Sequence, residues 1–227
     1  MIKIAPSMLS ADFLHLEKDV EMVNRSADIF HLDVMDGLLV PNLSYGFPVI
    51  EAIAKAAEKP MDIHLMIVQP ERYFERFAKT GAKYMSFHLE AAEKEGVDAG
   101  ALLEQIRSYG IKAGLAINPD IPVEKVFPYL EHADFILIMS VFAGFGGQKF
   151  IEDTFSRVET LRQEISRLGI DCEIEVDGGV SEANAAKLAK AGADILVAGS
   201  SVFKSPDPSN ACLLYTSPSP RDAHESR

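Results

Sequence analysis

Short apolar runs rich in β-branched residues alternate with longer amphipathic stretches along almost the whole chain, and this alternation restricts the fold more than any other feature. The apolar runs predict strands over Lys3–Pro6, Ile29–Val34, Met61–Met66, Tyr84–Phe87, Lys112–Ala116, Phe135–Met139, Glu173–Val176 and Ile195–Ala198. The amphipathic stretches predict helices over Phe13–Asn24, Pro48–Ala57, Pro70–Lys79, Ala99–Ser108, Pro122–Glu131, Ile151–Leu168 and Glu182–Ala191. Strands separated by helices form a parallel sheet with the helices outside it, and this number of strands in one domain predicts a (β/α)8 TIM barrel.

A doubly wound parallel sheet is the alternative fold. That fold usually carries a glycine-rich turn after its first strand. The turn that follows Lys3–Pro6 reads SMLSADF and contains no glycine. The barrel is therefore the favoured architecture.

The C-terminal segment does not continue the pattern. A barrel needs a final helix after the strand Ile195–Ala198, but the segment that follows contains Pro206, Pro208, Pro218 and Pro220. Because proline breaks helix interiors, we expect a barrel domain of residues 1–204 that lacks its final helix. Residues 205–227 would then be a disordered or artefactual tail, with a genuine but divergent terminus as the alternative.

The chain carries a net charge of −12, from 22 Lys and Arg against 34 Asp and Glu, and it has no basic run. Proteins that bind nucleic acid or anionic membranes need a basic face, so we expect neither partner. The two cysteines, Cys172 and Cys212, cannot build a disulfide framework. The N-terminal stretch has no apolar signal-peptide core, and no apolar run has the length of a membrane span. We therefore expect a cytoplasmic protein.

Two predicted strands carry histidine and aspartate on one face. Residues two apart on a strand point the same way, so His31 shares a face with Asp33, and Asp62 with His64. Asp177 stands at the end of a later strand, where barrel active sites lie. Mixed imidazole and carboxylate donors suit Zn²⁺, Fe²⁺, Mn²⁺ or Co²⁺. The sequence thus predicts a divalent transition-metal site, with hydrogen-bonded core histidines as the alternative.

Glycines gather in the loops after the last three predicted strands, at Gly144, Gly146, Gly147, Gly178, Gly179 and Gly199. Backbone N–H groups of such loops bind phosphate, and barrels commonly place phosphate after their seventh and eighth strands. Ordinary turns are the alternative. Near the same strand ends lie Met8, Met35, Met66 and Met139, which form either ordinary core or a dry floor for a delocalised anion.

Several segments, in order along the chain, resemble the ribulose-phosphate 3-epimerase family. They are APSMLSADF at residues 5–13, HLDVMDG at 31–37, VPN at 40–42, HLM at 64–66, GFGGQKF at 144–150 and EVDGG at 175–179. The resemblance covers about residues 2–208, and the pair HLDVMDG and EVDGG is highly specific. It implies a barrel of the ribulose-phosphate-binding type. Its reaction would be epimerisation at C3 of D-ribulose 5-phosphate to D-xylulose 5-phosphate, with one bound divalent metal.

The resemblance also implies roles for individual residues. The metal ligands would be His31, Asp33, His64 and Asp177, and Asp33 with Asp177 would form the acid/base pair on opposite sides of a flat enediolate. Substrate contacts would come from Ser7, His64, Gly144, Phe145, Gly146, Gly147, Gly178, Gly179, Gly199 and Ser200. We interpret Met35, Met66 and Met139 as an apolar lining that keeps water from the enediolate. The family forms dimers and larger assemblies, so we expect a homo-oligomer that acts on a small phosphosugar.

Two loops depart from the family pattern. Phe142-Ala143 stands where the family usually has Asn-Pro, and Leu38-Leu39 stands where it often has His-Phe or Val-Phe. D-allulose-6-phosphate 3-epimerase, which acts on a sugar one carbon longer, therefore stays an alternative. The orotidine-phosphate decarboxylase group is disfavoured, because its Asp-x-Lys motif is Asp62-Ile63-His64 here. A truncated barrel that binds phosphosugar without turnover is a further alternative, since a missing helix would leave apolar surface open.

Overall fold

Parallel strands form the centre of the molecule in the computed structural model, which describes residues 2–216. Within that range the sheet has eight strands: β1 (Lys3–Pro6), β2 (Phe30–Met35), β3 (Met61–Met66), β4 (Tyr84–His88), β5 (Lys112–Ile117), β6 (Phe135–Met139), β7 (Glu173–Asp177) and β8 (Ile195–Ala198). They pair in the order β1-β8-β7-β6-β5-β4-β3-β2, and a parallel bridge between Ser7 and His31 spans the remaining gap between β1 and β2. The predicted TIM barrel is confirmed.

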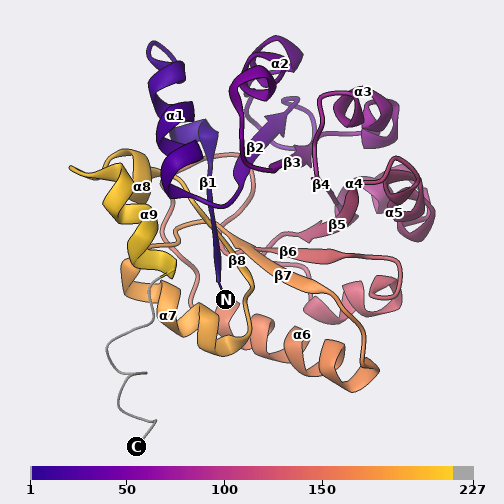
Figure 1. Cartoon of the computed structure of the whole chain (residues 1–227). Coiled ribbons are helices and arrows are strands. Elements are labelled where there is room, and N and C mark those ends of the chain that lie inside the picture. The colour runs from indigo at the N-terminus through magenta and orange to yellow at the C-terminus, as the bar shows by residue number, and fades with distance from the viewer. Residues whose placement is uncertain (1, 217–227) are drawn as a thin grey trace, which may run out of the picture.

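Helices surround the ring of strands on the outside (Figure 1). The α-helices are α1 (Leu16–Ser26), α2 (Phe47–Ala56), α3 (Phe74–Ala78), α4 (Leu89–Glu95), α5 (Ala99–Ser108), α6 (Thr154–Leu168), α7 (Glu182–Ala191), α8 (Ser200–Phe203) and α9 (Pro208–Thr216). Short 3-10 helices are η1 (Met8–Ser10), η2 (Pro70–Arg72) and η3 (Val123–Tyr129). Ser181 and Asn184 form a capping box at the start of α7, which ends at Gly192 in the left-handed conformation.

Several predicted helices differ in kind or extent from those observed. The stretch Pro122–Glu131 is a 3-10 helix rather than an α-helix, with Pro128 inside it, where proline has no N–H to donate to an α-helical ladder. The stretch Pro70–Lys79 is divided between η2 and α3, and Phe13–Asn24 becomes helical only at Leu16. No helix was predicted from the sequence where α4 lies.

The expectation that the barrel lacks a final helix is wrong, because α9 forms one. Pro208 is the first residue of α9, a position where the missing N–H breaks no hydrogen bond. Cys212 and Tyr215 of this helix are buried in the core. In Figure 1, α9 lies beside α1 and α7, with which it is in contact, and it covers the surface expected to be open. Residues 217–227 of the predicted tail lie outside the described residues.

Side chains alternate across the barrel wall. On β6, Ile136 and Ile138 join the core between strands and helices, whereas Phe135, Leu137 and Met139 fill the barrel interior. Gly114 of β5 makes room for Phe135, since an added Cβ would lie 2.2 Å from Cζ of that ring. The wall thus separates a mainly apolar outer core from an interior that holds the buried histidines and carboxylates.

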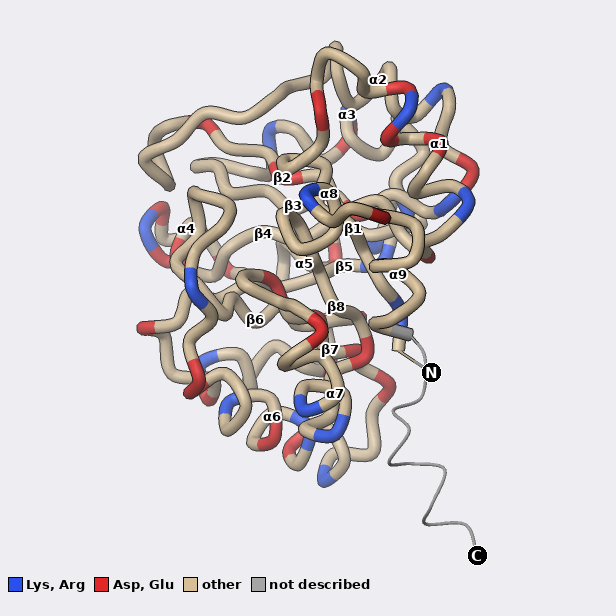
Figure 2. The backbone as a smooth tube through the Cα atoms, turned by 90° about the vertical axis from the view of Figure 1, so that its left-hand side faces the viewer, with Lys and Arg blue, Asp and Glu red and all other residues tan. Residues whose placement is uncertain are grey.

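Lys and Arg positions are interspersed with Asp and Glu along the outer helices on the side of the molecule shown in Figure 2. This mixture agrees with the acidic composition and with the lack of a basic run in the sequence. Among the described residues, no helix combines the length and apolar character needed to cross a membrane.

Candidate active site

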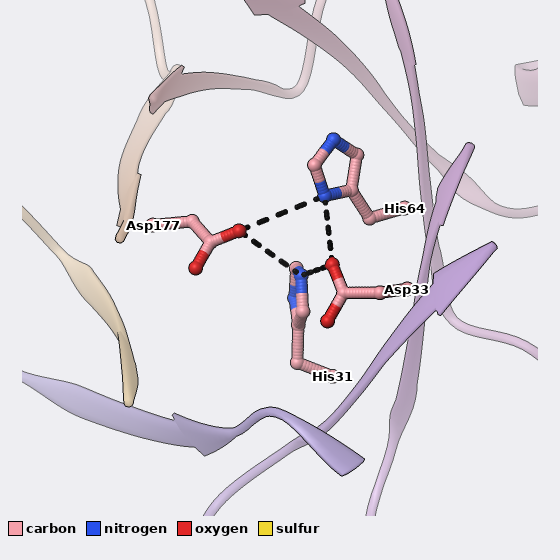
Figure 3. Close-up of side chains that lie close together, drawn as sticks. All are labelled: His31, Asp33, His64 and Asp177. Carbon is pink, nitrogen blue, oxygen red and sulfur yellow. Dashed lines mark hydrogen bonds and ion pairs between the residues drawn. The ribbon is translucent and has the colours of Figure 1, made fainter. Parts of the chain in front are cut away.

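Two neighbouring strands bring histidine and aspartate together at the mouth of the barrel. β2 and β3 pair in register, which sets His31 opposite Asp62 and Asp33 opposite His64. All four side chains are buried. Because the side chains of paired residues on parallel strands point to the same face, each histidine gains an aspartate neighbour on the adjacent strand. Asp177, the last residue of β7, approaches the same space from the far side of the barrel (Figure 3).

Four donor atoms converge there. His31 Nε2 lies 3.3 Å from Asp33 Oδ1 and 3.8 Å from Asp177 Oδ2. His64 Nδ1 lies 3.2 Å and 3.8 Å from the same two oxygens. One donor atom from each of His31, Asp33, His64 and Asp177 lies within 4.8 Å of the other three. The structure therefore brings together all of the residues predicted as metal ligands.

The orientation of His31 fits a cation at this point. Its Nδ1 lies 2.7 Å from Asp62 Oδ2, so that side of the ring is held by a carboxylate. Its Nε2 is buried and has no hydrogen-bond partner within the described chain. A second-layer carboxylate that fixes one ring nitrogen and leaves the other free is typical of metal-bound histidine. The imidazole and carboxylate donors suit a divalent transition metal, so the residues present fit the predicted group.

The two carboxylates of the site differ in their ionisation. Burial opposes the charge on Asp33, but His31 and His64 outweigh it and hold the pKa of the Asp33 carboxyl well below its usual range. Burial, together with the negative charge of Asp33, raises the pKa of Asp177 to about 7. Ser7 Oγ donates a hydrogen bond of 2.6 Å to Asp33 Oδ2. Near neutral pH the site thus holds one ionised carboxylate and one carboxyl group poised to carry a proton.

The two imidazoles differ as well. Burial lowers the pKa of His64 to about 4, against the opposing hydrogen bond to Asp33. Burial also disfavours the charged form of His31, but Asp33 and Asp62 more than compensate and raise its pKa well above the usual value. The structure therefore favours positive charge at His31, next to the two aspartates, where a bound cation would supply it.

A cavity opens above these groups and joins them to the glycine-rich loops. Its lining includes most of the residues that we predicted to contact substrate or intermediate: Ser7, Met35, Met66, Met139, Gly144, Phe145, Gly146, Gly147, Gly178, Gly179, Gly199 and Ser200. His64, also predicted as a substrate contact, is fully buried and is not among the lining residues. Gly179 has φ +61°, and an added Cβ would lie 2.7 Å from the backbone nitrogen of Phe150, so the two loops approach closely only because this residue is glycine.

Met8 does not belong to this lining. It is fully buried among the side chains between strands and helices, because η1 turns it away from the barrel interior. The interpretation of Met8 as part of a dry floor at the mouth is therefore wrong, and only the other three methionines reach the cavity.

The sequence reading did not assign roles to three inward-facing residues that touch the site. Asp62 contacts His31, and Glu175 Oε1 lies 3.2 Å from the same Nδ1. His88 Nε2 lies 2.9 Å from His64 Nε2. Strand periodicity was the available signal, because Asp62 and Glu175 share parity with His64 and Asp177, and His88 shares parity with Tyr84 on β4.

The two departures from the family pattern lie in different places. Phe142 and Ala143 line the cavity. Leu38 is 70% exposed and lines a separate groove beside the mouth, while Leu39 packs against the barrel interior. Of the two departures, only Phe142-Ala143 borders the space where substrate would bind.

Comparison with known proteins gives consistent similarities. Residues 3–203 match the model of the ribulose-phosphate 3 epimerase family. The chain is 44% identical over 207 residues to ribulose-phosphate 3-epimerase of Synechocystis sp., covering 91% of this chain and 89% of that protein. It is 41% identical over 209 residues to the Bacillus subtilis ribulose-phosphate 3-epimerase, covering 91% and 94%. Among solved structures, KGPDC from Streptococcus mutans has a TM-score of 0.70 at 12% identity over 95% of this chain and 96% of that one, a likeness of fold alone.

Proposed function

The chain belongs to the ribulose-phosphate 3-epimerase family, and we propose that it interconverts D-ribulose 5-phosphate and D-xylulose 5-phosphate by moving a proton at C3. The observation that carries the proposal is the facing pair of carboxylates, Asp33 and Asp177, which approach one space from opposite walls of the barrel (Figure 3). Inversion at a carbon beside a ketone needs a base on one face and an acid on the other.

The ligands of the metal would be His31, Asp33, His64 and Asp177. When bound, a divalent ion of zinc, iron, manganese or cobalt would supply a Lewis acid that stabilises the negative charge developing on the C2 oxygen. Asp62 holds the ring of His31 in the orientation that this binding requires.

Asp33, ionised at neutral pH, accepts the C3 proton on one face of the sugar. The electron pair of the broken C–H bond forms the C2–C3 double bond, and the carbonyl electrons move to the C2 oxygen, giving an enediolate. Asp177, which can hold a proton near pH 7, returns one to C3 on the opposite face, and the carbonyl re-forms. One carboxyl has gained a proton and the other has lost one, so the reverse reaction uses the pair with their roles exchanged.

The rest of the cavity divides into two surfaces. The loops that carry Gly144–Gly147, Gly178, Gly179, Gly199 and Ser200 supply backbone N–H groups for the phosphate. Met35, Met66 and Met139 form the apolar surface beside the reacting carbons, where exclusion of water strengthens the electrostatic stabilisation of the enediolate. Ser7 and His64 contact the substrate as well as holding Asp33.

The experiment that tests this function is solvent-deuterium incorporation at C3, followed by NMR. Metal-loaded protein receives D-ribulose 5-phosphate in one tube and D-allulose 6-phosphate in another. We expect rapid incorporation and conversion with the pentulose phosphate, and loss of both after chelation. Preference for the hexulose phosphate would show that Phe142-Ala143 has altered the pocket. Absence of exchange in both tubes, with folded and metal-loaded protein, would overturn the proposal.

Four wider expectations accompany this function. The protein acts on its small phosphosugar as a homo-oligomer in the cytoplasm, and it has no nucleic-acid or membrane partner. Sedimentation velocity tests the oligomeric state, and a filter-binding assay with duplex DNA tests nucleic-acid binding.

A further inference from the structure

A line of buried polar contacts leads away from His64 on the side opposite the reacting groups. His88, the last residue of β4, places its Nε2 2.9 Å from His64 Nε2, with the two rings stacked at a centroid distance of 5.1 Å. His88 Nδ1 and Glu90 Oε2 are both buried without a hydrogen-bond partner in the described part of the chain, and they lie 3.6 Å from each other. This separation is longer than a hydrogen bond, so the contact between them is electrostatic.

The line continues from Glu90 to a loop of the active-site cavity. Glu90 Oε1 accepts two hydrogen bonds from Asn118, one from its backbone N–H at 3.0 Å and one from Nδ2 at 2.8 Å. Asn118 Oδ1 in turn accepts the backbone N–H of Ala143 at 2.9 Å. Arg157 stabilises the position of Asn118, because its guanidinium donates hydrogen bonds to the carbonyls of Asn118 and Met139.

The chemistry of these groups ties the proton positions to metal binding. In the metal-free protein the Asp33 carboxylate, which only accepts hydrogen bonds, favours a proton on His64 Nδ1 at 3.2 Å. A metal ion bound through Nδ1 would need the lone pair there, so His64 Nε2 would carry the proton and donate it to His88 Nε2. His88 would then carry its own proton on Nδ1, 3.6 Å from the Glu90 carboxylate.

We propose that His88, Glu90 and Asn118 are positioning residues that join the His64 imidazole to the loop Phe142–Gly147. They stabilise the tautomer in which His64 can bind a metal through Nδ1, and they anchor the loop at the amide of Ala143. This inference rests on the proposed function for the identity of His64 as a ligand. It makes the binding of a metal and the order of a substrate loop depend on one chain of polar contacts.

The test compares wild type with His88→Phe, which keeps a ring but removes both nitrogens, and with His88→Gln, which restores an acceptor. Ser86→Ala is the matched control, because Ser86 is buried on the same strand and its Oγ has no partner in the described structure. Two measurements use no sugar phosphate: Co²⁺ titration by calorimetry and amide hydrogen exchange of the loop.

In His88→Phe we expect Co²⁺ affinity to fall about 10- to 100-fold and exchange at Ala143 to accelerate. His88→Gln should recover part of each, and Ser86→Ala should match wild type.

Unchanged Co²⁺ affinity and unchanged exchange at Ala143 in folded His88→Phe would overturn the proposal. Should that variant fail to fold, Glu90→Gln, which keeps the size of the side chain, must show the same losses. Because the readouts need only Co²⁺ and the protein, failure of the epimerase assay would leave this result standing.

Discussion

Two polar layers lie inside the barrel, and they differ in how completely their atoms are paired. At the N-terminal ends of the strands, Glu173 receives Lys3 Nζ on one carboxylate oxygen at 2.5 Å and Lys112 Nζ on the other at 2.8 Å. The pKa of Glu173 is lowered, because these two lysines outweigh the effect of its partial burial. This basal layer consists of charges that satisfy one another.

The polar atoms of the second layer, toward the mouth, are not paired in this way. His31 Nε2, Asp62 Oδ1 and both oxygens of Glu175 are buried without hydrogen-bond partners among the described residues. Burial and the negative charge of Asp62 raise the pKa of Glu175 well above its usual value. Unpaired buried polar atoms cost free energy, so a fold keeps them where they serve a ligand or a reaction. The comparison therefore separates residues that stabilise the barrel from residues that give it chemistry.

The largest expected effect belongs to Asp177→Asn. The substitution keeps the shape of the side chain but removes the proton donor, so kcat with D-ribulose 5-phosphate should fall by about three orders of magnitude. NMR of the sugar phosphate measures the rate, and circular dichroism confirms the fold. Glu173→Gln, made in the basal layer, should leave kcat unchanged. Equal losses in the two variants would erase the distinction between the layers.

The pH dependence of stability sharpens the same comparison. The pKa of Asp177 is raised to about 7, so the folded, metal-free protein holds this proton more tightly than the unfolded chain. The resulting stabilisation is complete below the unfolded pKa and is lost as pH rises through the folded one. Asparagine does not titrate. The unfolding free energy of Asp177→Asn minus that of wild type should therefore rise by on the order of 4 kcal/mol between about pH 4 and pH 8.

Urea unfolding in the presence of a chelator measures this difference at several pH values. The subtraction removes the contributions of titrating groups that do not interact with Asp177. A difference that stays flat across the range would show that Asp177 is not the group that carries the raised pKa.

Metal binding should stabilise the protein through the ligands at the mouth of the barrel and not through the basal layer. At a free Co²⁺ concentration of a hundred times Kd, the unfolding free energy should rise by about 2.7 kcal/mol. Glu173→Gln should keep the whole increase. His31→Gln should lose most of it, because this variant lacks the imidazole that would bind the metal. Thermal unfolding with and without Co²⁺ gives the answer. An increase retained in His31→Gln would place the metal elsewhere.

The architecture and the members of the site could be predicted because both depend on local periodicity. Alternation with a period of two placed His31 with Asp33 and Asp62 with His64 on common faces, and the in-register pairing of β2 and β3 then joined them. The chemical type of these side chains then indicated a metal site, because imidazole and carboxylate donors together suit a divalent transition metal.

Distances and helix positions could not be predicted in the same way. The link between His64 and His88 depends on how strongly the strands curve around the barrel, which no single segment specifies. The helix α9 escaped prediction because the composition of its segment suggested a break, whereas what matters for Pro208 is its position in the first turn.

The smallest expected effect lies in the basal layer. Glu173→Gln removes the charge shared by Lys3 and Lys112, both of which are partly exposed to solvent, so the loss of unfolding free energy near pH 7 should be only about 1 kcal/mol. Because the pKa of Glu173 is lowered in the folded protein, its contribution is present above the unfolded pKa and disappears as pH falls through the folded one. The difference between the variant and wild type should therefore shrink on acidification, opposite in sign to the trend at Asp177, and urea unfolding at several pH values measures both. A Glu173→Gln difference that grew as pH fell would mean that this carboxylate also holds a proton, and the basal layer would then share the character of the mouth.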